Sequence, residues 1–474
     1  MDIIDLRRAM LRWRGLWLRW FASAVVPPEV KGVLRTLEEG GGEAVVVGGC
    51  VRDLMTGRRP EDWDVATSLE PDRVRRLFSR TIPTGIDHGT VTVMVGEVGI
   101  EVTTYRTEGA YTDRRHPDWV HFSSELHEDL ARRDFTFNAM ALTVGGEIID
   151  PFDGLEDLAR GRVVTVGRAT DRFAEDALRM VRAVRFAAQL DMELAPEAHR
   201  ACTEMSEGLD AVSRERIRYE LDRIIMSDSP ARGFEMLRET GLLERFWPEL
   251  VEGFGVEQNR HHAFTVWEHT MTSLQATVDI EGADLALRLA VLLHDVAKPR
   301  CLEIGPGGER HFYNHHVVGA AVARRLLKRL RYDNRTIDRV THLTRHHMAL
   351  HHYPQMKDSA IRRLINRVGL ENIHDLINLR IADRAGSGTK EAPLSRGTVY
   401  LLERIGRVLE EDAAFGLGDL AVDGKDVMRV GGLEPGPQVG EILETLLDEV
   451  LEDPALNERS ILEKRIEELA RARS

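Results

Sequence analysis

The chain has 474 residues, 43% apolar and 30% charged, which is the composition of a globular protein of about three domains and excludes disorder over most of its length. Its formal net charge of −14 excludes a uniformly basic protein that coats nucleic acid, so any RNA binding must come from a local patch. The chain lacks an apolar run of about eighteen residues, so no membrane span is expected, and its three scattered cysteines predict neither a disulfide framework nor a zinc site and indicate a reducing compartment.

The N-terminus carries apolar residues at helical spacing with arginines between them. Met10, Trp13, Trp17 and Trp20 recur at steps of three and four residues. This pattern predicts a basic amphipathic helix within residues 1–40, and not a secretory signal, which would need a continuous apolar run. Three interpretations of this helix stay open: packing on its own domain, translation from an upstream start codon, or contact with a membrane surface.

Residues 41–150 read as a small α/β unit. EAVVVGG predicts a buried strand, TVTVMVGEVGIEVTTYR a hairpin that turns at Gly96 and Gly99, and ALTVGGEIID a second, short hairpin, whereas PDRVRRLF is helical. From about residue 170 onward the helical period dominates, beginning with FAEDALRMVRAVRFAAQL, which contains no Gly or Pro. The expected architecture is a small mixed head followed by a long helical body.

The first candidate site follows the first predicted strand. Gly48 and Gly49 would let backbone N–H groups approach a phosphate, and Arg52 could add a charged fork. Taken alone, however, a glycine pair after a strand is typical of an ordinary turn.

Two carboxylates come next, at Asp62 and Asp64. On a strand, residues two apart point to the same face, where two carboxylates repel unless a divalent cation neutralises them. Hard oxygen ligands select Mg²⁺ or Mn²⁺, and a pair of such ions can activate a 3′-hydroxyl and stabilise leaving pyrophosphate. Glu101 is either a third carboxylate of this site or a charge on the exposed face of the hairpin.

A third polar group comprises Arg132, Arg133, Asp134 and Asn138. It offers charge for a triphosphate and hydrogen bonds for a sugar. In isolation the same residues are also typical of the first turn of a helix with solvated arginines.

Five short motifs occur in a fixed order along the chain: GGCVRD, DWD, RRDFTFNAMAL, DPFDGLEDL and EDALRMVRAVRFAA. In this order they resemble the class II tRNA nucleotidyltransferases, which are the CCA-adding enzymes and the bacterial poly(A) polymerases. The motifs cover about residues 45–225. The resemblance implies an α+β fold with a polymerase-β-like nucleotidyltransferase head (mixed sheet with helices) and an all-α neck, body and tail. It implies transfer of CMP and AMP from CTP and ATP onto a tRNA 3′ end. The expected domains are residues 1–40, 41–150 (head), 151–258 (neck and RNA-binding body), 259–390 and 391–474 (tail).

The resemblance also assigns roles to residues of the head. It implies that Asp62 and Asp64, with Glu101 as a further candidate, hold Mg²⁺. It implies nucleotide contacts from the glycine turn and from the arginine group, namely Gly48, Gly49, Arg52, Asp53, Arg132, Arg133, Asp134 and Asn138. Which of Arg132 and Arg133 matches the family residue is open by one position.

Base choice is expected on the next helix, where Asp176, Arg179, Arg182 and Arg185 step by three and fan over one half of the helix. Asp176 can accept from an exocyclic amine while Arg179 donates to a ring acceptor. Cytosine and adenine both present that pattern, and uracil and guanine reverse it. In the family this pair is said to act as a protein template, and Arg182 and Arg185 would serve the triphosphate.

Histidines are concentrated in residues 259–390, in an order that looks like an HD domain, a helical metal-dependent phosphohydrolase. His262, His294, Asp295 and Asp383 could bind one ion, and one histidine each from His315–His316 and His346–His347 could complete a second site. Mn²⁺, Fe, Ni²⁺ or Mg²⁺ would suit such ligands. The alternative is a helical body without metal chemistry that only holds tRNA. We expect His269 and His311 to be structural or surface residues.

The leading hypothesis is therefore a cytoplasmic CCA-adding enzyme whose partners are tRNA, CTP and ATP, with no DNA and no membrane span, in an unknown oligomeric state. Within the same family, a poly(A) polymerase or an enzyme that adds only CC or only A remains open. Two alternatives of other classes are an HD-type nucleotide phosphodiesterase with a regulatory head and an RNA-binding scaffold without turnover.

Overall fold

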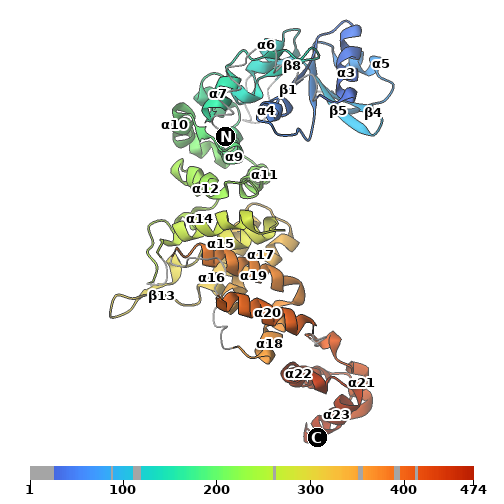
Figure 1. Cartoon of the computed structure of the whole chain (residues 1–474), viewed down its shortest axis with the longest axis vertical. Helices are drawn as coiled ribbons and strands as arrows, with labels where there is room; N and C mark the ends of the chain where they lie inside the picture. Colours follow the sequence, from blue (N-terminus) through green and yellow to red (C-terminus); the bar gives the residue numbers. More distant parts are fainter. Residues whose placement is uncertain are drawn as a thin grey trace. The chain divides into compact units, whose positions relative to one another are not determined.

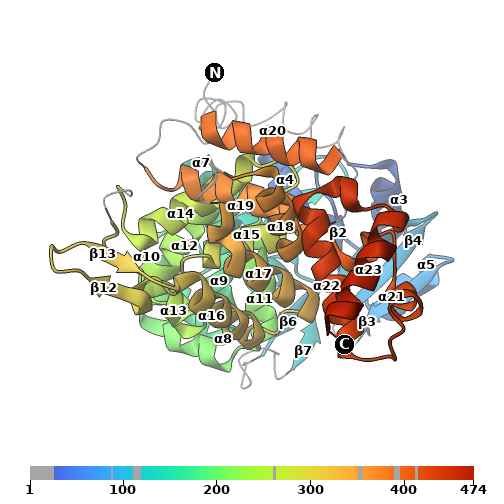
Figure 2. The same ribbon diagram turned by 90° about the horizontal axis from the view of Figure 1, so that it is seen from below.

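The computed structural model describes residues 26–86, 89–109, 119–259, 263–350, 356–388, 396–410 and 415–473. Residues 10–20, whose pattern predicted an amphipathic N-terminal helix, lie outside these described residues. Contacts divide the chain into two compact units, residues 1–246 and 247–474, which Figures 1 and 2 draw from two directions. Among the described residues, no helix is both long and apolar enough to cross a membrane.

The core of unit 1 is a seven-stranded sheet with strand order β3-β4-β5-β2-β1-β8-β9. Its neighbouring strands are antiparallel except β2 and β5, which are parallel. The sheet strands are β1 (Ala44–Val47), β2 (Asp64–Thr67), β3 (Thr81–Gly85), β4 (Thr90–Val95), β5 (Val98–Thr104), β8 (Ala141–Thr143) and β9 (Ile148–Ile149). The buried first strand and both predicted hairpins, β4–β5 and β8–β9, are confirmed.

Helices and short strands surround this sheet in unit 1. Helices α3 (Pro28–Glu39) and α4 (Gly49–Met55) contact β1, and α5 (Pro71–Leu77) contacts β4, as Figure 1 shows. The remaining strands are β6 (Arg106–Glu108), which pairs with β7 (Val120–Phe122), and β10 (Arg162–Val163), which pairs with β11 (Glu193–Leu194). The remaining helices are α6 (Leu126–Ala131), α7 (Gly154–Arg160), α8 (Ala169–Glu175), α9 (Leu178–Leu190), α10 (Pro196–Met205), α11 (Arg214–Ile225) and α12 (Pro230–Glu239).

One predicted helix is interrupted. FAEDALRMVRAVRFAAQL contains no Gly or Pro, yet α8 ends at Glu175 and α9 begins at Leu178. Asp176 has an extended backbone (φ −145°, ψ 106°), and its carboxylate accepts a hydrogen bond from the Leu178 N–H at 3.0 Å. The side chain thus satisfies a free backbone donor at the start of α9, as an N-cap residue does. This hydrogen bond explains how the helix is interrupted although the segment contains no Gly or Pro.

The described residues of unit 2 are helical apart from one hairpin, β12 (Leu302–Ile304) with β13 (Arg310–Phe312). Its first helices are α13 (Pro248–Val251), α14 (Val266–Ala276), α15 (Leu285–Leu293), α16 (His315–Arg329), α17 (Asn334–His346), α18 (Asp358–Val368) and α19 (Ile373–Ala385). The later ones are α20 (Arg396–Glu410), α21 (Gly424–Gly431), α22 (Pro437–Glu452) and α23 (Arg459–Arg473). The α+β class, with a mixed-sheet head and a helical C-terminal region, is confirmed.

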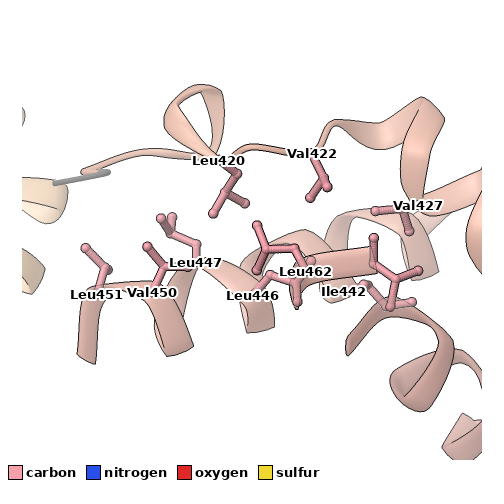
Figure 3. Packing of buried hydrophobic residues seen from close by; sticks show 10 residues of the cluster. Leu420, Val422, Val427, Ile442, Leu446, Leu447, Val450, Leu451 and Leu462 are labelled. Carbon is pink, nitrogen blue, oxygen red and sulfur yellow. The ribbon is translucent and has the colours of Figure 1, made fainter. Parts of the chain in front are cut away.

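The last three helices pack around an apolar cluster of their own. Leu446 and Val450 of α22 lie beside Leu462 of α23, and Leu420 and Val422 close the cluster from the preceding segment (Figure 3). All five side chains are buried. Their burial explains why the acidic C-terminal segment folds, because apolar area removed from water is the main favourable term available to it.

Candidate active site

A polar cavity of about 460 Å³ opens in unit 1. Most of the residues predicted to bind nucleotide line it, together with four that we did not predict or predicted in another role. Its lining comprises Gly48, Gly49, Arg52, Asp64, Arg132, Arg133, Asp134, Asn138, Asp176, Leu178, Arg179, Arg182, Phe186 and Arg216. Asp53, Asp62, Glu101 and Arg185 are not part of this lining.

The glycine turn between β1 and α4 needs glycine for a local reason. Gly48 has a φ of 81°, and a Cβ there would lie 2.9 Å from Arg133 Nη1 and 3.6 Å from Asp64 Oδ2. A side chain would therefore be strained and would enter the space that those two charged groups share. The glycines thus bring the backbone, a carboxylate and a guanidinium together at one end of the cavity.

The three candidate carboxylates are close in the fold, although not as a strand pair. Asp62 precedes β2, so the prediction that Asp62 and Asp64 share one strand is wrong; only Asp64 is in the strand. Asp64 is in register with Glu101 of β5. Burial raises the pKa of Asp64, the charges of Glu101 and Asp62 raise it further, and Arg133 opposes them. Such mutual repulsion among hard oxygen donors is what a divalent cation relieves.

Arg132 and Arg133 are both held by Asp129, a buried residue of α6 that we did not predict. Asp129 Oδ1 lies 2.8 Å from Arg132 Nη2, and its Oδ2 lies 3.3 Å from Arg133 Nη2. The spacings of three and four residues are those of helical ion pairs and could have revealed it. Since both arginines line the cavity, its geometry does not choose between them.

Asp134 joins the head to α9. Its Oδ2 accepts two hydrogen bonds from Arg182, at 2.9 and 2.6 Å, and its Oδ1 accepts one from Asn138 at 3.0 Å. Burial would raise the pKa of Asp134, but the charge of Arg182 and these hydrogen bonds lower it to about 2. Asn138 Oδ1 in turn accepts from Arg52 Nη1 at 3.0 Å. A chain of charge-assisted contacts therefore fixes Arg52, Asn138 and Arg182 along the cavity.

The DPFDGLEDL segment supports Asn138 from behind. A Cβ on Gly154 would lie 2.4 Å from the Thr136 carbonyl oxygen, so only glycine allows α7 to pack here. Thr136 Oγ1 also donates to Asp157 Oδ2 at 2.7 Å. Helix α7 thus holds Thr136 in the 3₁₀ turn Thr136–Asn138 by close packing and by a hydrogen bond, which accounts for this motif without giving it any chemistry of its own.

The predicted base-reading pair, Asp176 and Arg179, reaches the cavity with one additional partner. Arg216 of α11 donates to Asp176 Oδ2 at 2.6 Å. Arg179 is held by Glu175 and by the carbonyl oxygens of Arg172 and Arg132, at 3.2 and 3.4 Å. Arg216 belongs to the SRERI sequence, but the 40 residues between it and Asp176 hide their contact from any local pattern.

Two predicted nucleotide contacts lie elsewhere. Arg185 is buried, and its Nη1 lies 2.9 Å from Glu220 Oε2 of α11, so it does not reach the cavity where it would touch a triphosphate. The three-residue step placed all four charged side chains on one half of the helix, but the last of them, Arg185, points into the protein interior. Asp53 pairs with Arg52 at 2.7 Å and orients that guanidinium rather than facing the cavity itself.

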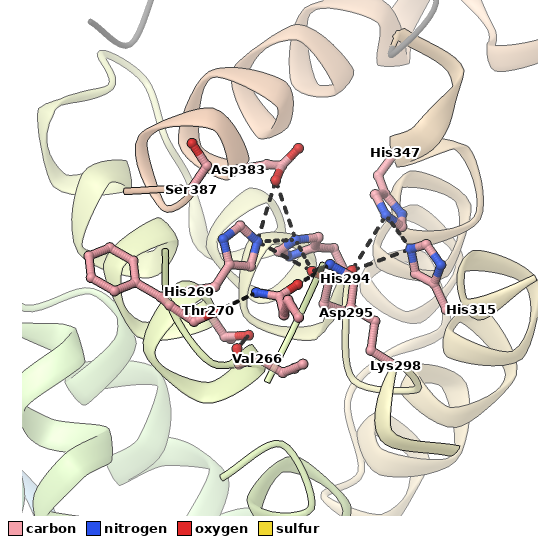
Figure 4. Close-up of polar contacts among 12 residues, drawn as sticks. Val266, His269, Thr270, His294, Asp295, Lys298, His315, His347, Asp383 and Ser387 are labelled. Atoms are coloured by element: carbon pink, nitrogen blue, oxygen red, sulfur yellow. Dashed lines mark hydrogen bonds and ion pairs between the residues drawn. The ribbon is translucent and has the colours of Figure 1, made fainter. Parts of the chain in front are cut away.

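A second polar centre lies within unit 2 (Figure 4). His269 of α14, His294 at the end of α15 and Asp383 of α19 are all buried and place one ligand atom each within 4.8 Å of the others. We expected His269 to be a structural or surface residue; it is buried and stands beside His294 and Asp383, with Nε2 3.2 Å from His294 Nε2, so it is also a candidate metal ligand. His262, which we predicted for this position, lies outside the described residues.

A second group of three adjoins the first. Asp295, His315 and His347 place their ligand atoms equally close together, which supports the prediction of one histidine from each later pair. Asp295 lies between the groups (Figure 4): its Oδ2 is 3.1 Å from His294 Nε2, and its Oδ1 is 3.4 Å from His315 Nε2. Lys298 Nζ is 2.7 Å from Oδ2. His311 instead stacks on Tyr313.

Family models match three segments of the chain. Residues 44–164 match the "Poly A polymerase head domain", residues 191–253 the "Probable RNA and SrmB-binding site of polymerase A", and residues 315–466 "tRNA nucleotidyltransferase domain 2 putative". The first match covers the glycine turn, the carboxylates and the arginine group. Fold, cavity and matches together define a nucleotidyltransferase.

Relatives of known activity match over nearly their whole length. The CCA-adding enzyme of Lactiplantibacillus plantarum is 33% identical over 91% of this chain and 94% of its own, and that of Lactococcus lactis is 31% identical over 92% and 95%. The crystal structure of the Bacillus stearothermophilus CCA-adding enzyme in complex with CTP, 30% identical, covers 94% of this chain and 99% of its own with a TM-score of 0.70. The chain belongs to the CCA-adding enzymes.

Proposed function

We propose that this protein adds CMP, CMP and AMP, from CTP and ATP, to the 3′ end of tRNA at the unit 1 cavity. One observation carries the proposal: a single cavity joins Asp64 at the start of β2, five arginines and the Asp176–Arg179 pair. These are the groups that a nucleoside triphosphate needs for its reacting phosphate, its leaving group and its base. The relatives named above carry the same activity in their names.

The triphosphate is bound by Arg52, Arg132 and Arg133, whose guanidinium groups are already oriented by Asp53 and Asp129. Orientation before binding matters because a fixed fork loses little entropy when it grips phosphate oxygens. Asn138, held by Arg52 and Asp134, is the hydrogen-bonding group for the ribose. The 3′-hydroxyl oxygen of the RNA attacks the α-phosphorus, and the bond to pyrophosphate breaks.

The carboxylates of Asp64 and Asp62, with Glu101 beside them, fit a hard divalent cation such as Mg²⁺, as the raised pKa of Asp64 supports. When bound there, the cation lowers the pKa of the RNA 3′-hydroxyl and stabilises the charge on pyrophosphate. Asp64 is the better-placed ligand because it lines the cavity itself. Asp62 does not line the cavity, but its charge acts on Asp64.

Base selection rests on Asp176 and Arg179. The carboxylate accepts from the exocyclic amine of cytosine or adenine, and the guanidinium donates to the adjacent ring acceptor. Uracil and guanine present a donor and an acceptor in the reverse order, so the acceptor Asp176 would face an acceptor and the donor Arg179 a donor. A base bound in this way forms neither hydrogen bond, which lowers its affinity relative to cytosine or adenine.

The test is the 3′-terminal sequence of the product. Purified protein incubated with tRNA lacking CCA, CTP and ATP is expected to yield molecules that end in CCA. Long runs of A, or termination after CC, would replace the proposal by the corresponding alternative in the family. UTP or GTP supplied alone is expected to give little product, because neither uracil nor guanine can form both hydrogen bonds with Asp176 and Arg179.

A second function, metal-dependent phosphoester hydrolysis in unit 2, is favoured by the two histidine–carboxylate groups. Mixed nitrogen and oxygen ligands suit Mn²⁺, Fe or Ni²⁺ better than Mg²⁺. Asp295 Oδ1 is buried, and no described residue donates a hydrogen bond to it, which is the environment of a carboxylate that binds a cation. We propose that His269, His294 and Asp383 hold one ion, that His315 and His347 hold another, and that Asp295 touches both.

The metal content of the purified protein tests this second proposal without relying on any activity. After incubation with Mn²⁺ and dialysis, the wild type is expected to retain about two equivalents by mass spectrometry beyond any ion at the carboxylates of unit 1, matching the two groups in unit 2. Asp295→Ala is expected to lose most of both because this carboxylate adjoins each group. Asp279→Ala, which removes an exposed carboxylate of the same unit, should retain the wild-type amount. Equal retention by all three proteins would contradict the proposal.

A further inference from the structure

Helix α11 carries a tyrosine whose exposure is unusual for its position. The ring of Tyr219 is 58% exposed, although Ile217, Leu221 and Ile224 of the same helix are completely buried. Arg223, one turn further on, places its Cζ 5.5 Å from the ring centroid and donates from Nη1 to the tyrosine oxygen at 3.2 Å. The ring is therefore held in place from one side and remains open to solvent elsewhere.

Tyr219 and Arg223 follow, along the same helix, a residue that lines the cavity. Arg216 lines the cavity and binds Asp176. Glu220, one turn on, is buried against Arg182 and Arg185 of α9. Because an α-helix rises about 1.5 Å per residue, Tyr219 lies about 4.5 Å and Arg223 about 10 Å further along the helix axis than Arg216. Tyr219 therefore lies within one helical turn of a residue that lines the cavity.

Aromatic rings beside arginines are how proteins hold single-stranded RNA. Bases stack on the ring, the guanidinium contributes charge and cation–π contact, and the contact tolerates any base because every base has a flat face. An enzyme that extends RNA must hold a single-stranded 3′ end next to the triphosphate. A fixed, exposed ring close to the base-reading residues has the chemistry for that task.

We propose that Tyr219, braced by Arg223, is a stacking platform for a base of the single-stranded 3′ end of the RNA primer. The inference rests on the proposed nucleotidyl transfer, because it places the primer beside the cavity of that reaction. It assigns to α11 a role in holding the RNA that is separate from the recognition of CTP or ATP by Asp176 and Arg179. Tyr219 is a positioning residue, since the proposal gives it no contact with the reacting atoms.

Kinetics separate this role from nucleotide binding. Tyr219→Ala is expected to raise KM for tRNA lacking CCA by about 5- to 150-fold, the range that one base–aromatic stack supplies. KM for CTP should change less than about twofold on this account, because the ring does not line the nucleotide cavity. Tyr219→Phe retains the ring and should restore the wild-type KM for RNA. Equal defects in the alanine and phenylalanine variants would overturn the stacking role.

A direct measurement uses tRNA lacking CCA with 2-aminopurine as its 3′-terminal base, because stacking quenches the fluorescence of this base. Wild type and Tyr219→Phe are expected to quench it on binding, and Tyr219→Ala is not. The matched control is Tyr400→Ala on α20, where Arg404 lies 5.6 Å from the centroid of a ring that is 48% exposed. This second tyrosine–arginine pair should be dispensable.

The outcomes distinguish the two proposals. Undiminished quenching and an unchanged KM for RNA in Tyr219→Ala overturn the platform even if CCA addition is normal. Loss of quenching by Tyr219→Ala in a protein that never incorporates CMP or AMP supports the platform and rejects nucleotidyl transfer. Circular dichroism of each variant should match that of the wild type, since an exposed ring contributes little to the core.

Discussion

Asp64→Ala is expected to lower kcat/KM for incorporation of CMP and AMP by about 10³-fold, the upper end of the effect of removing one preorganised group that stabilises charge in a transition state. Asp64 is the carboxylate that lines the cavity, beside Gly48 and Arg133. Asp64→Asn keeps the shape of the side chain but not its charge, so it should be nearly as inactive. The measurement is incorporation of labelled CTP into tRNA lacking CCA, at saturating Mg²⁺.

The same substitutions should leave the protein at least as stable as the wild type when a chelator is present. Burial and neighbouring carboxylates raise the pKa of Asp64 above its unfolded value, so the ionised side chain disfavours the folded state at neutral pH. This loss of stability is absent at pH values well below the pKa of Asp64 in the unfolded chain. It is complete at pH values above the raised pKa of Asp64 in the folded protein. Asp64→Asn should therefore show an unchanged or higher Tm at neutral pH, although it is inactive.

Asp72→Ala is the control for this pair of results. Asp72 is an exposed carboxylate of α5 in the same unit, with only a 3.6 Å ion pair to Arg75, and its removal should change neither activity nor Tm appreciably. An Asp64→Ala enzyme within tenfold of wild type would contradict the assignment of the catalytic centre. A large loss of stability in Asp64→Asn would instead show that its carboxylate is structural.

The parts of the site that lie on local motifs were predictable from the sequence. The glycine turn, the arginine pair and Asn138 occur within short segments, and the order of these segments along the chain, rather than any one of them alone, indicates phosphate and sugar contacts. Strand β1 and the hairpins β4–β5 and β8–β9 were equally predictable, because alternation and glycine turns are local signals. These are also the segments where residues that act together are close in the chain.

What could not be predicted depends on contacts between distant segments. The break at Asp176 has no Gly or Pro to announce it, and the partner that holds its side chain, Arg216, is 40 residues away. Arg185 carries the same charge and spacing as Arg182, but only the packing of α11 decides that one reaches the cavity while the other is buried. Likewise, His269 could be recognised as a candidate ligand only after α14, α15 and α19 had been brought together.

Glu220→Ala is expected to destabilise unit 1 by about 3–5 kcal/mol, the usual result of removing one partner from a buried ion pair. Glu220 is 2% exposed and lies 2.9 Å from Arg185 Nη1 and 3.5 Å from Arg182 Nη1. Burial already lowers the pKa of Arg185 to about 10, although Glu220 opposes the shift, so losing the carboxylate leaves an uncompensated buried charge. Urea unfolding, with hydrogen exchange of α9 and α11 to localise the change, measures the loss.

The double variant Glu220→Leu with Arg185→Met separates buried charge from lost packing. If the cost of Glu220→Ala comes from the unpaired guanidinium, replacing both partners with apolar side chains of similar size should recover most of the stability, because neither charge then has to be desolvated. Arg182 keeps its two hydrogen bonds to Asp134 in either variant, so the cavity should retain its shape and much of its activity. If the double variant is as unstable as Glu220→Ala, the ion pair itself holds α9 against α11, and the unpaired guanidinium is not the whole cause of the loss.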